Sequence, residues 1–315
     1  MQTDCIAGSF EFEAFDGRCV VAAFDGGAIT SQAGALLLRQ TGRAIGLFER
    51  LASCFIDHRD PGLTVHGLPA LVGQRIVAIA LGHEDLDDHD RLRHDPVLAL
   101  LADGLQSRRS DCAALAGKST LNRLEHAPEG APGRYHRIGH DGAAIERLFV
   151  DLFLEAQQTS PRQIVIDLDA TDDPLHGHQE GRFFHGYYDC YCYLPLYIFC
   201  GRHLLAAKLR RANIDASAGA VGAIAPIVMQ IRQAWPRVKI ILRADSGFAR
   251  EALMAWCEAN GVEYVFGLAR NQRLEKRLAA GLDEACRVSQ VSGVAARVYR
   301  DFLCLPRIAG HAAAG

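Results

Sequence analysis

The sequence contains no long hydrophobic run. None of its apolar stretches approaches the roughly 20 residues that a membrane-spanning helix needs, and its first residues lack the basic and apolar regions of a secretion signal. Hydrophobic residues make up 49% and charged residues 23% of the chain, which is typical of a globular protein. We therefore expect a soluble cytoplasmic protein, whose 315 residues are enough for two domains.

Closely spaced cysteine pairs are also missing. Ten cysteines are present, but only Cys190 and Cys192 are near neighbours, and zinc-binding pairs normally have a two-residue gap. Cysteines scattered singly along a chain indicate reduced, mostly buried thiols in a reducing compartment. The sequence therefore predicts neither disulfides nor a zinc site.

An excess of positive charge is absent as well. The formal net charge is −3, whereas DNA-binding domains are usually basic. Lysine is scarce, but arginine is abundant, and basic residues cluster at 202–211 and 270–277. Arginine binds phosphate in a bidentate manner, so the total charge neither favours nor excludes a nucleic-acid partner.

The first part of the chain has mostly helical patterns. Apolar residues recur every three or four positions from Leu63 to Ala80 and again from Pro96 to Leu105. The intervening segment 82–96 is rich in aspartate and histidine, and we expect a solvated loop there rather than a metal site. Residues 1–30 indicate no more than a short strand or arm.

A segment rich in proline and glycine, 127–133, separates the helical part from the rest. We therefore expect a mostly helical N-terminal region at 1–126, a linker at 127–140 and a second domain at 141–315.

In the second domain, strand and helix patterns follow the order βββαβαβα after a first helix at 141–157. The expected strands are 163–169, 191–200, 203–210, 239–244 and 263–268, and the expected helices are 216–235, 249–260 and 271–280. Consecutive strands with short turns, followed by two crossover units, predict a mixed sheet in the order 3-2-1-4-5. This is the plan of a ribonuclease-H-like fold.

Two strands of this sheet end in aspartate. Asp169 ends the first strand and Asp245 follows the fourth, and the predicted order makes these strands neighbours. Each aspartate alone would be taken for a turn or cap residue. Two carboxylates at one sheet edge can instead share a hard divalent cation. Asp167 lies two residues before Asp169 on the same strand face and is the alternative first ligand.

Longer motifs strengthen this interpretation. Because of these motifs, the chain resembles DDE transposases of the IS1380 family, in the IS4-like group. The matching segments are Ser31–Arg39, Asp57–Pro61, Gln74–Ala80, Gly82–Pro96, Lys118–Glu125, Ile166–Gly177 and Leu242–Phe248. The resemblance implies an insertion-sequence enzyme that cuts and joins double-stranded DNA at its terminal inverted repeats, as a homodimer at the bacterial nucleoid.

The resemblance also implies a chemistry. Three acidic residues of the family hold two Mg²⁺ ions, for which Mn²⁺ can substitute, and these ions activate the nucleophile and stabilise the leaving oxygen. Carried over by motif, the first two acids are Asp169 and Asp245. The residues expected to contact DNA are Lys118, Arg123, Arg210, Arg211, Arg243, Arg270 and Arg273.

The departure from the family lies at the C-terminal end. Residues 303–315 do not resemble the family's continuation, which carries the third acid on a helix, and they suggest a frameshift or premature stop. Glu275 and Glu284 follow the fifth strand but do not stand in the family's glutamate motif. We therefore expect a defective copy whose sheet lacks its last covering helix. The alternative is a non-catalytic remnant that binds the inverted repeats and inhibits the full-length enzyme.

Two weaker motifs have ordinary explanations. The segment Ala116–Thr120 resembles half of a phosphate-binding loop, but Cys112 stands where the full motif needs glycine, so Ser119 or Thr120 is expected to cap a helix. Tyrosines at 187, 188, 191 and 193 could stack on bases, although alternation along a strand favours packing on the sheet.

Overall fold

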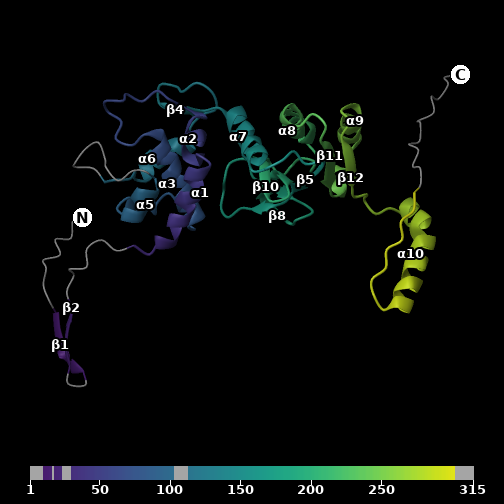
Figure 1. Cartoon of the computed structure of the whole chain (residues 1–315), viewed down its shortest axis with the longest axis horizontal. Coiled ribbons are helices and arrows are strands. Elements are labelled where there is room, and N and C mark those ends of the chain that lie inside the picture. Colours follow the sequence, from purple (N-terminus) through teal and green to yellow (C-terminus); the bar gives the residue numbers. More distant parts are fainter. Residues whose placement is uncertain (1–9, 16–17, 23–29, 103–112, 302–315) are drawn as a thin grey trace.

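The computed structural model describes residues 10–15, 18–22, 30–102 and 113–301, and the predicted tail at 303–315 lies outside these residues (Figure 1). A helical region at the N-terminal side is followed by a mixed α/β region and then by a separate helix. In the described part of the chain, no helix combines the length and apolar character required to cross a membrane.

The N-terminal region is mainly helical. Its elements are the hairpin β1 (Phe10–Phe15) and β2 (Arg18–Ala22), the short helix η1 (Ala33–Ala35), and then α1 (Leu36–Ala44), α2 (Leu47–Ala52), β3 (Phe55–Asp57), α3 (Leu68–Ala80), α4 (His89–Leu92), α5 (Pro96–Leu101), α6 (Lys118–Glu125) and β4 (Ile138–His140). Helix α3 contributes to two apolar clusters: Val77 packs with α5, whereas Leu71 and Val72 pack with α6.

The segment rich in aspartate and histidine differs from the solvated loop that was expected. His89 begins α4 and is completely buried. Its Nδ1 lies 2.9 Å from the side-chain nitrogen of Gln74, which is itself 1% exposed. The Gln74 amide also donates to the carbonyl oxygen of Ala116 at 2.8 Å and accepts from its backbone N–H at 3.0 Å. This buried network connects α3, α4 and the start of α6.

The predicted linker is ordered. Strand β4 pairs antiparallel with β3, and the backbone N–H of Gly130 donates to the carbonyl of His140 at 2.8 Å. Ala127 is buried in the same cluster as Leu121 and Leu124 of α6. Residues 127–140 are therefore attached to the N-terminal helices, because pairing with β3 satisfies backbone groups that a free linker would leave to water.

The second region is built on a five-stranded mixed sheet. Its strands are β5 (Gln163–Ala170), β9 (Leu196–Cys200), β10 (His203–Lys208), β11 (Lys239–Ala244) and β12 (Glu263–Phe266), and their order is β10-β9-β5-β11-β12. Strand β5 pairs antiparallel with β9 and parallel with β11, and β11 pairs parallel with β12. Numbered along the chain, this order is 3-2-1-4-5.

The core of this region lies on one side of the sheet. Ile164, Ile166 and Leu168 of β5 are buried in one apolar cluster with side chains of α7 (Gly142–Glu155), α8 (Ala220–Ala234) and α9 (Glu251–Ala259). Because successive strand residues face opposite sides, the intervening residues Asp167 and Asp169 lie on the other face. Asp167 is half-buried and Asp169 is exposed.

The segment between β5 and β9 is more ordered than the sequence indicated. It forms a small sheet in the order β6-β8-β7 from β6 (Asp173–Pro174), β7 (Phe183–His185) and β8 (Cys190–Tyr193). The expected single strand 191–200 is therefore divided into β8 and β9. Pro195 stands at the division, and proline cannot donate a hydrogen bond to a neighbouring strand.

Helix α10 (Gln272–Ser292) stands apart from the sheet (Figure 1) and contains no buried residue. It continues beyond the expected end at residue 280. Leu282 and Val291 on this helix are 58% and 90% exposed.

The structure describes the side chains of six cysteines; Cys5, Cys112 and Cys304 lie outside the described residues, and only the backbone of Cys19 is described. Cys54, Cys190, Cys192, Cys200, Cys257 and Cys286 are free. Burial raises the pKa of Cys200 and of Cys257 to about 11. Their thiols therefore stay protonated at neutral pH and are not nucleophiles.

Candidate functional site

The pairing of β5 with β11 sets the position of the two strand-end aspartates. The last paired residues are Arg243 with Asp167 and Ala244 with Leu168, so Asp245 and Asp169 are the next residues on the two strands. Parallel neighbours lie about 4.8 Å apart and end at the same sheet edge. Both aspartates are exposed at that edge, and the register sets the two residues next to each other on neighbouring strands.

Asp245 is held at the end of its strand by a local turn. Its Oδ1 accepts a hydrogen bond of 2.8 Å from the backbone N–H of Gly247 and caps the short helix η2 (Ser246–Phe248). Gly267, after β12, passes so close that an added Cβ would lie 2.9 Å from the backbone nitrogen of Ser246. Gly247 in the turn and Gly267 beside it thus allow the turn to lie close to the sheet. The second carboxylate oxygen of Asp245 takes no part in the cap.

Asp167, the alternative first ligand, is occupied by an ion pair. The Nε and Nη2 atoms of Arg243 lie 2.5 and 2.9 Å from its two carboxylate oxygens. This pairing raises the pKa of Arg243. Because both oxygens of Asp167 face a guanidinium, Asp169 is the better placed carboxylate to share a cation with Asp245.

Tyr188 lies beside these carboxylates. Its hydroxyl is 3.4 Å from the carbonyl oxygen of Ala170. Burial raises the pKa of Tyr188, and the negative charges of Asp172, Asp169 and Asp245 raise it further. The carboxylates of Asp172, Asp169 and Asp245 therefore lie near enough to Tyr188 to act on its hydroxyl.

Two aspartates supply hard oxygen donors, which suit Mg²⁺ or Mn²⁺. Within residues 10–15, 18–22, 30–102 and 113–301, no three acidic, histidine or cysteine side chains converge on one point that could hold a metal. Glu275 lies 2.9 Å from Arg270, and Glu284 pairs with Arg300. Both glutamates belong to α10, away from the sheet (Figure 1).

The predicted DNA-contacting residues fall into different environments. Arg123 lines a cavity, and Arg211, Arg243, Arg270 and Arg273 are exposed. Lys118 is paired with Asp87 at 2.8 Å. The Arg210 guanidinium donates to the carbonyls of Leu194, Ala216 and Ala218 at 2.7 to 3.0 Å, and burial lowers its pKa. Arg210 therefore stabilises the loop before α8.

Helix α6 begins at Lys118, so the expected cap at Ser119 or Thr120 is wrong. Gly117 is the N-cap residue, and glycine has no side chain that could accept a hydrogen bond. Asp90 supplies the acceptor instead: its Oδ1 accepts from the backbone N–H of Lys118 at 3.1 Å. This contact joins α4 to the start of α6.

A basic cavity in the N-terminal region was not predicted as a unit. It has a volume of about 670 Å³ and is lined by His58, Arg59, Asp60, Leu63, Thr64, Val65, His66, Thr120, Arg123 and Arg137. Asp60 is the only acid in this lining. Arg59 is paired with Asp57 at 2.7 Å, whereas burial and the nearby arginines lower the pKa of His66. In the sequence, only the adjacent His58-Arg59 and His136-Arg137 dipeptides hint at this cavity.

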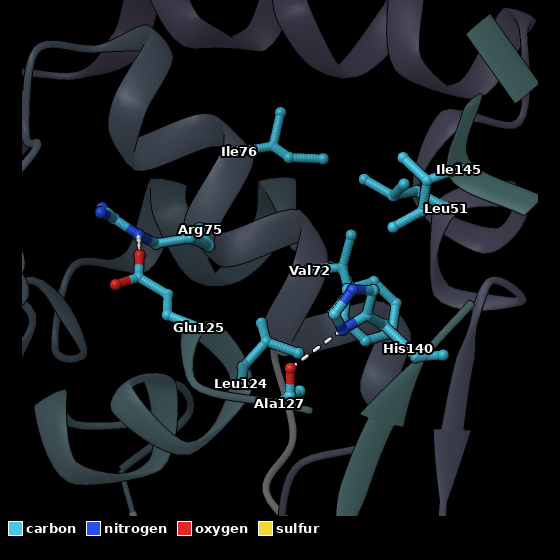
Figure 2. A pocket seen from close by; sticks show the side chains of 10 residues that line it. Leu51, Val72, Arg75, Ile76, Leu124, Glu125, Ala127, His140 and Ile145 are labelled. Atoms are coloured by element: carbon cyan, nitrogen blue, oxygen red, sulfur yellow. Dashed lines mark hydrogen bonds and ion pairs between the residues drawn. The ribbon is translucent and has the colours of Figure 1, made fainter. Parts of the chain in front are cut away.

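A second cavity, of about 300 Å³, is apolar (Figure 2). Leu51, Val72 and Ile76 face it, while Arg75 and Glu125 form an ion pair at its side. His140 is held by the carbonyl of Ala127 at 2.9 Å. The lining has no pair of carboxylates, so the candidate active site remains at the sheet edge.

The mixed α/β architecture, with a mixed sheet and two carboxylates at its edge, is consistent with a ribonuclease-H-like fold. The family model described as "Transposase DDE domain group 1" matches residues 12–304, and the chain belongs to this family. No curated protein gives a significant match.

Solved transposase structures are similar only at a distance. The catalytic domain of Mos1 mariner transposase is 11% identical, with 55% of this chain and 79% of that chain covered and a TM-score of 0.27. The piggyBac transposase synaptic complex with hairpin DNA is 12% identical, with 76% of this chain and 52% of that chain covered and a TM-score of 0.34. The chain thus spans about half of the piggyBac chain, and no site residue is assigned from either similarity.

Proposed function

We propose that this protein is an insertion-sequence transposase of the IS1380 family, in the IS4-like group, which cuts and joins DNA at terminal inverted repeats. The observation that carries the proposal is the register that sets Asp169 and Asp245 side by side in a chain of the DDE transposase family. The DNA partner implies a location at the bacterial nucleoid, and cutting two transposon ends favours a homodimer.

Asp169 and Asp245 are the residues that would hold Mg²⁺ or Mn²⁺. A bound ion would activate a water or a 3′-hydroxyl of the DNA as the nucleophile and would stabilise negative charge during in-line phosphoryl transfer. The carboxylates fix the sheet edge as the point of reaction. Arg243 keeps Asp167 in an ion pair next to them and so leaves Asp169 as the first acid.

The N-terminal region, residues 1–126, is proposed to bind the DNA, and residues 141–315 to carry the chemistry. Arg123 and Arg137 in the basic cavity can contact phosphates, as can the exposed Arg270 and Arg273. Such contacts position DNA without selecting its sequence.

A second candidate function is non-catalytic binding of the inverted repeats, which would inhibit a full-length enzyme. It is favoured by the positions of Glu275 and Glu284, which are both ion-paired on α10 rather than at the sheet edge. With two carboxylates, fewer negative charges attract the cation than in the three-acid site of the family.

The experiment that tests the proposal is cleavage of a duplex carrying the inverted repeats that flank the coding sequence, in Mg²⁺ or Mn²⁺. We expect metal-dependent cuts at the repeat ends, lost at least about a hundredfold in Asp245→Asn. The matched control is Asp283→Asn, which changes an exposed aspartate on α10 and leaves cleavage intact. Binding without cleavage by both the unchanged protein and Asp245→Asn supports the second candidate. Nicking of unrelated DNA indicates a nuclease without strand transfer.

A further inference from the structure

The basic cavity of the N-terminal region is built from three separate segments of the chain. The loop after β3 supplies the wall from His58 to His66, and Arg137 directly precedes β4. Helix α6 adds Thr120 and Arg123, which are three residues apart and therefore lie on one face of the helix. The backbone N–H of His58 donates to the carbonyl of Arg137 at 2.8 Å, which extends the β3–β4 pairing to the cavity wall. The fold thus brings Arg123 and Arg137 to one cavity from different elements.

These two arginines are not neutralised by the protein. Among the described residues, neither the Arg123 guanidinium nor the Arg137 guanidinium contacts an acceptor. Arg59, in contrast, donates from Nε and Nη2 to the two carboxylate oxygens of Asp57 at 2.8 and 2.7 Å. Asp60, the acid of the lining, accepts from a backbone N–H of its own turn at 2.8 Å. The cavity therefore offers guanidinium groups that are free to bind an anion.

A histidine in the same lining lies close to positive charge. His66 is half-buried, and burial together with the charges of Arg59 and Arg93 lowers its pKa. A bound anion would offset these charges and favour the protonated ring, in which both nitrogens donate. The lining can therefore respond to an anion that carries more than one negative charge.

The size of the cavity fits more than a lone phosphate. Its volume of about 670 Å³ lies within the range of roughly 300–1,000 Å³ that is typical of small-molecule sites. Leu63, which is 83% exposed, and Val65 make part of the lining apolar. Such side chains can cover a sugar or a base that is attached to the phosphate, because both present apolar surface.

We propose that the basic cavity binds the terminal phosphate monoester of a nucleotide, at the end of a DNA strand or on a free mononucleotide. A phosphate inside a duplex carries a sugar on both sides, whereas a terminal phosphate has a free side that can enter a cavity. A monoester also carries about 1.5 to 2 negative charges at neutral pH, which suits paired N–H···O bonds from Arg123 and Arg137. For a DNA end, this inference rests on the proposed function and names the phosphate that the N-terminal region contacts.

The test compares two fluorescent probes, a blunt 20-bp duplex with 5′-phosphate ends and the same duplex with 5′-hydroxyl ends. Both are titrated at low salt in EDTA and a phosphate-free buffer, so that no DNA is cut and binding is measured apart from catalysis. We expect the phosphate-ended probe to bind at least about tenfold more tightly. Calorimetry with deoxyadenosine 5′-monophosphate, and with deoxyadenosine as its phosphate-free control, measures binding of the free mononucleotide.

Four variants identify the groups responsible. Arg123→Gln and Arg137→Gln should each lose most of the preference for the phosphate. Arg137→Lys retains the charge and should retain part of the preference, which distinguishes loss of an anion ligand from misfolding. Arg134→Gln is the matched control and should have no effect, because Arg134 is an exposed arginine of the same segment that does not line the cavity.

The two sources of the phosphate give different results. Preference for the phosphate-ended duplex without binding of the mononucleotide assigns the cavity to DNA ends. Binding of the mononucleotide without a preference between the duplexes assigns it to free nucleotides. A protein that binds the mononucleotide but neither binds nor cuts DNA would contradict the proposed function and support this site.

Two results would overturn the proposal. One is equal affinity for the two duplexes together with no binding of the mononucleotide, even in a protein that cuts the inverted repeats. The other is a preference for phosphate that survives in both Arg123→Gln and Arg137→Gln.

Discussion

Replacement of Gln74 by leucine should strongly destabilise the N-terminal region. Gln74 is 1% exposed, and its amide makes hydrogen bonds to both backbone groups of Ala116 and to Nδ1 of His89. Leucine fills a similar volume but makes none of these bonds. Each buried group left without a partner costs about 1–3 kcal/mol, so leaving the three partners of Gln74 unpaired should cost about 3–9 kcal/mol. That is a large fraction of the ~5–15 kcal/mol by which native proteins are stable.

The assay is urea denaturation followed by far-UV circular dichroism, with free energies from linear extrapolation. Gln233→Leu is the matched control, because Gln233 is exposed near the end of α8 and its replacement should change stability by no more than about 0.5 kcal/mol. A Gln74→Leu protein within 1 kcal/mol of the unchanged one would refute the argument that this network connects α3, α4 and α6.

Three other predictions follow from the same contacts. Burial lowers the pKa of His89 below 6.5, so the unfolded protein binds a proton at a higher pH than the folded protein does. The free energy of unfolding should therefore fall by up to about 1.4 kcal/mol per pH unit as the pH drops through and below 6.5. Equal urea midpoints at pH 7.5 and 5.5 would contradict this. Asp169→Asn should lower the Mn²⁺ affinity measured by calorimetry at least about tenfold, whereas Asp167→Asn should change this affinity by no more than about twofold. The opposite result for the two variants would make Asp167 the first acid. Arg123→Ala should reduce the slope of log affinity against log salt for duplex DNA by about one, and an unchanged slope would place Arg123 outside the DNA contact.

The positions of the strand ends were predictable because local sequence determines them. An apolar β-branched run followed by aspartate and a turn indicates a strand end, and Asp169 and Asp245 both fit this pattern. The parallel pairing of β5 with β11 then follows from the order of strands and crossover helices. Local pattern and chain connectivity together were enough to place the two aspartates at one edge.

Contacts that depend on register or on distant partners were not predictable. The ion pair between Asp167 and Arg243 exists because the two residues are directly paired across neighbouring strands, which requires the exact alignment of β5 and β11. Similarly, His89 lies in a segment that looks hydrophilic, but the partner that satisfies its Nδ1 is Gln74 on another helix. Composition along the chain cannot reveal such a partner.

The division of strand 191–200 depends on both local and distant groups. Pro195 interrupts the ladder, but the separate small sheet also needs β6 and β7 as partners for β8. The same sheet leaves the Tyr191 ring 50% exposed, whereas alternation along the expected strand 191–200 favoured packing of this ring on the main sheet. The tertiary pairing therefore changed the interpretation of this tyrosine.

The central claim is that Asp169 and Asp245 together hold one divalent cation site. The most direct test is to bind Fe²⁺ in place of Mg²⁺, add peroxide, and map where the radicals formed at the metal cut the polypeptide. The account predicts cuts close to residues 169 and 245 in the same molecule population, suppressed by excess Mg²⁺ and absent from Asp245→Asn. Cuts at other segments, or cuts that persist in Asp245→Asn, would contradict it.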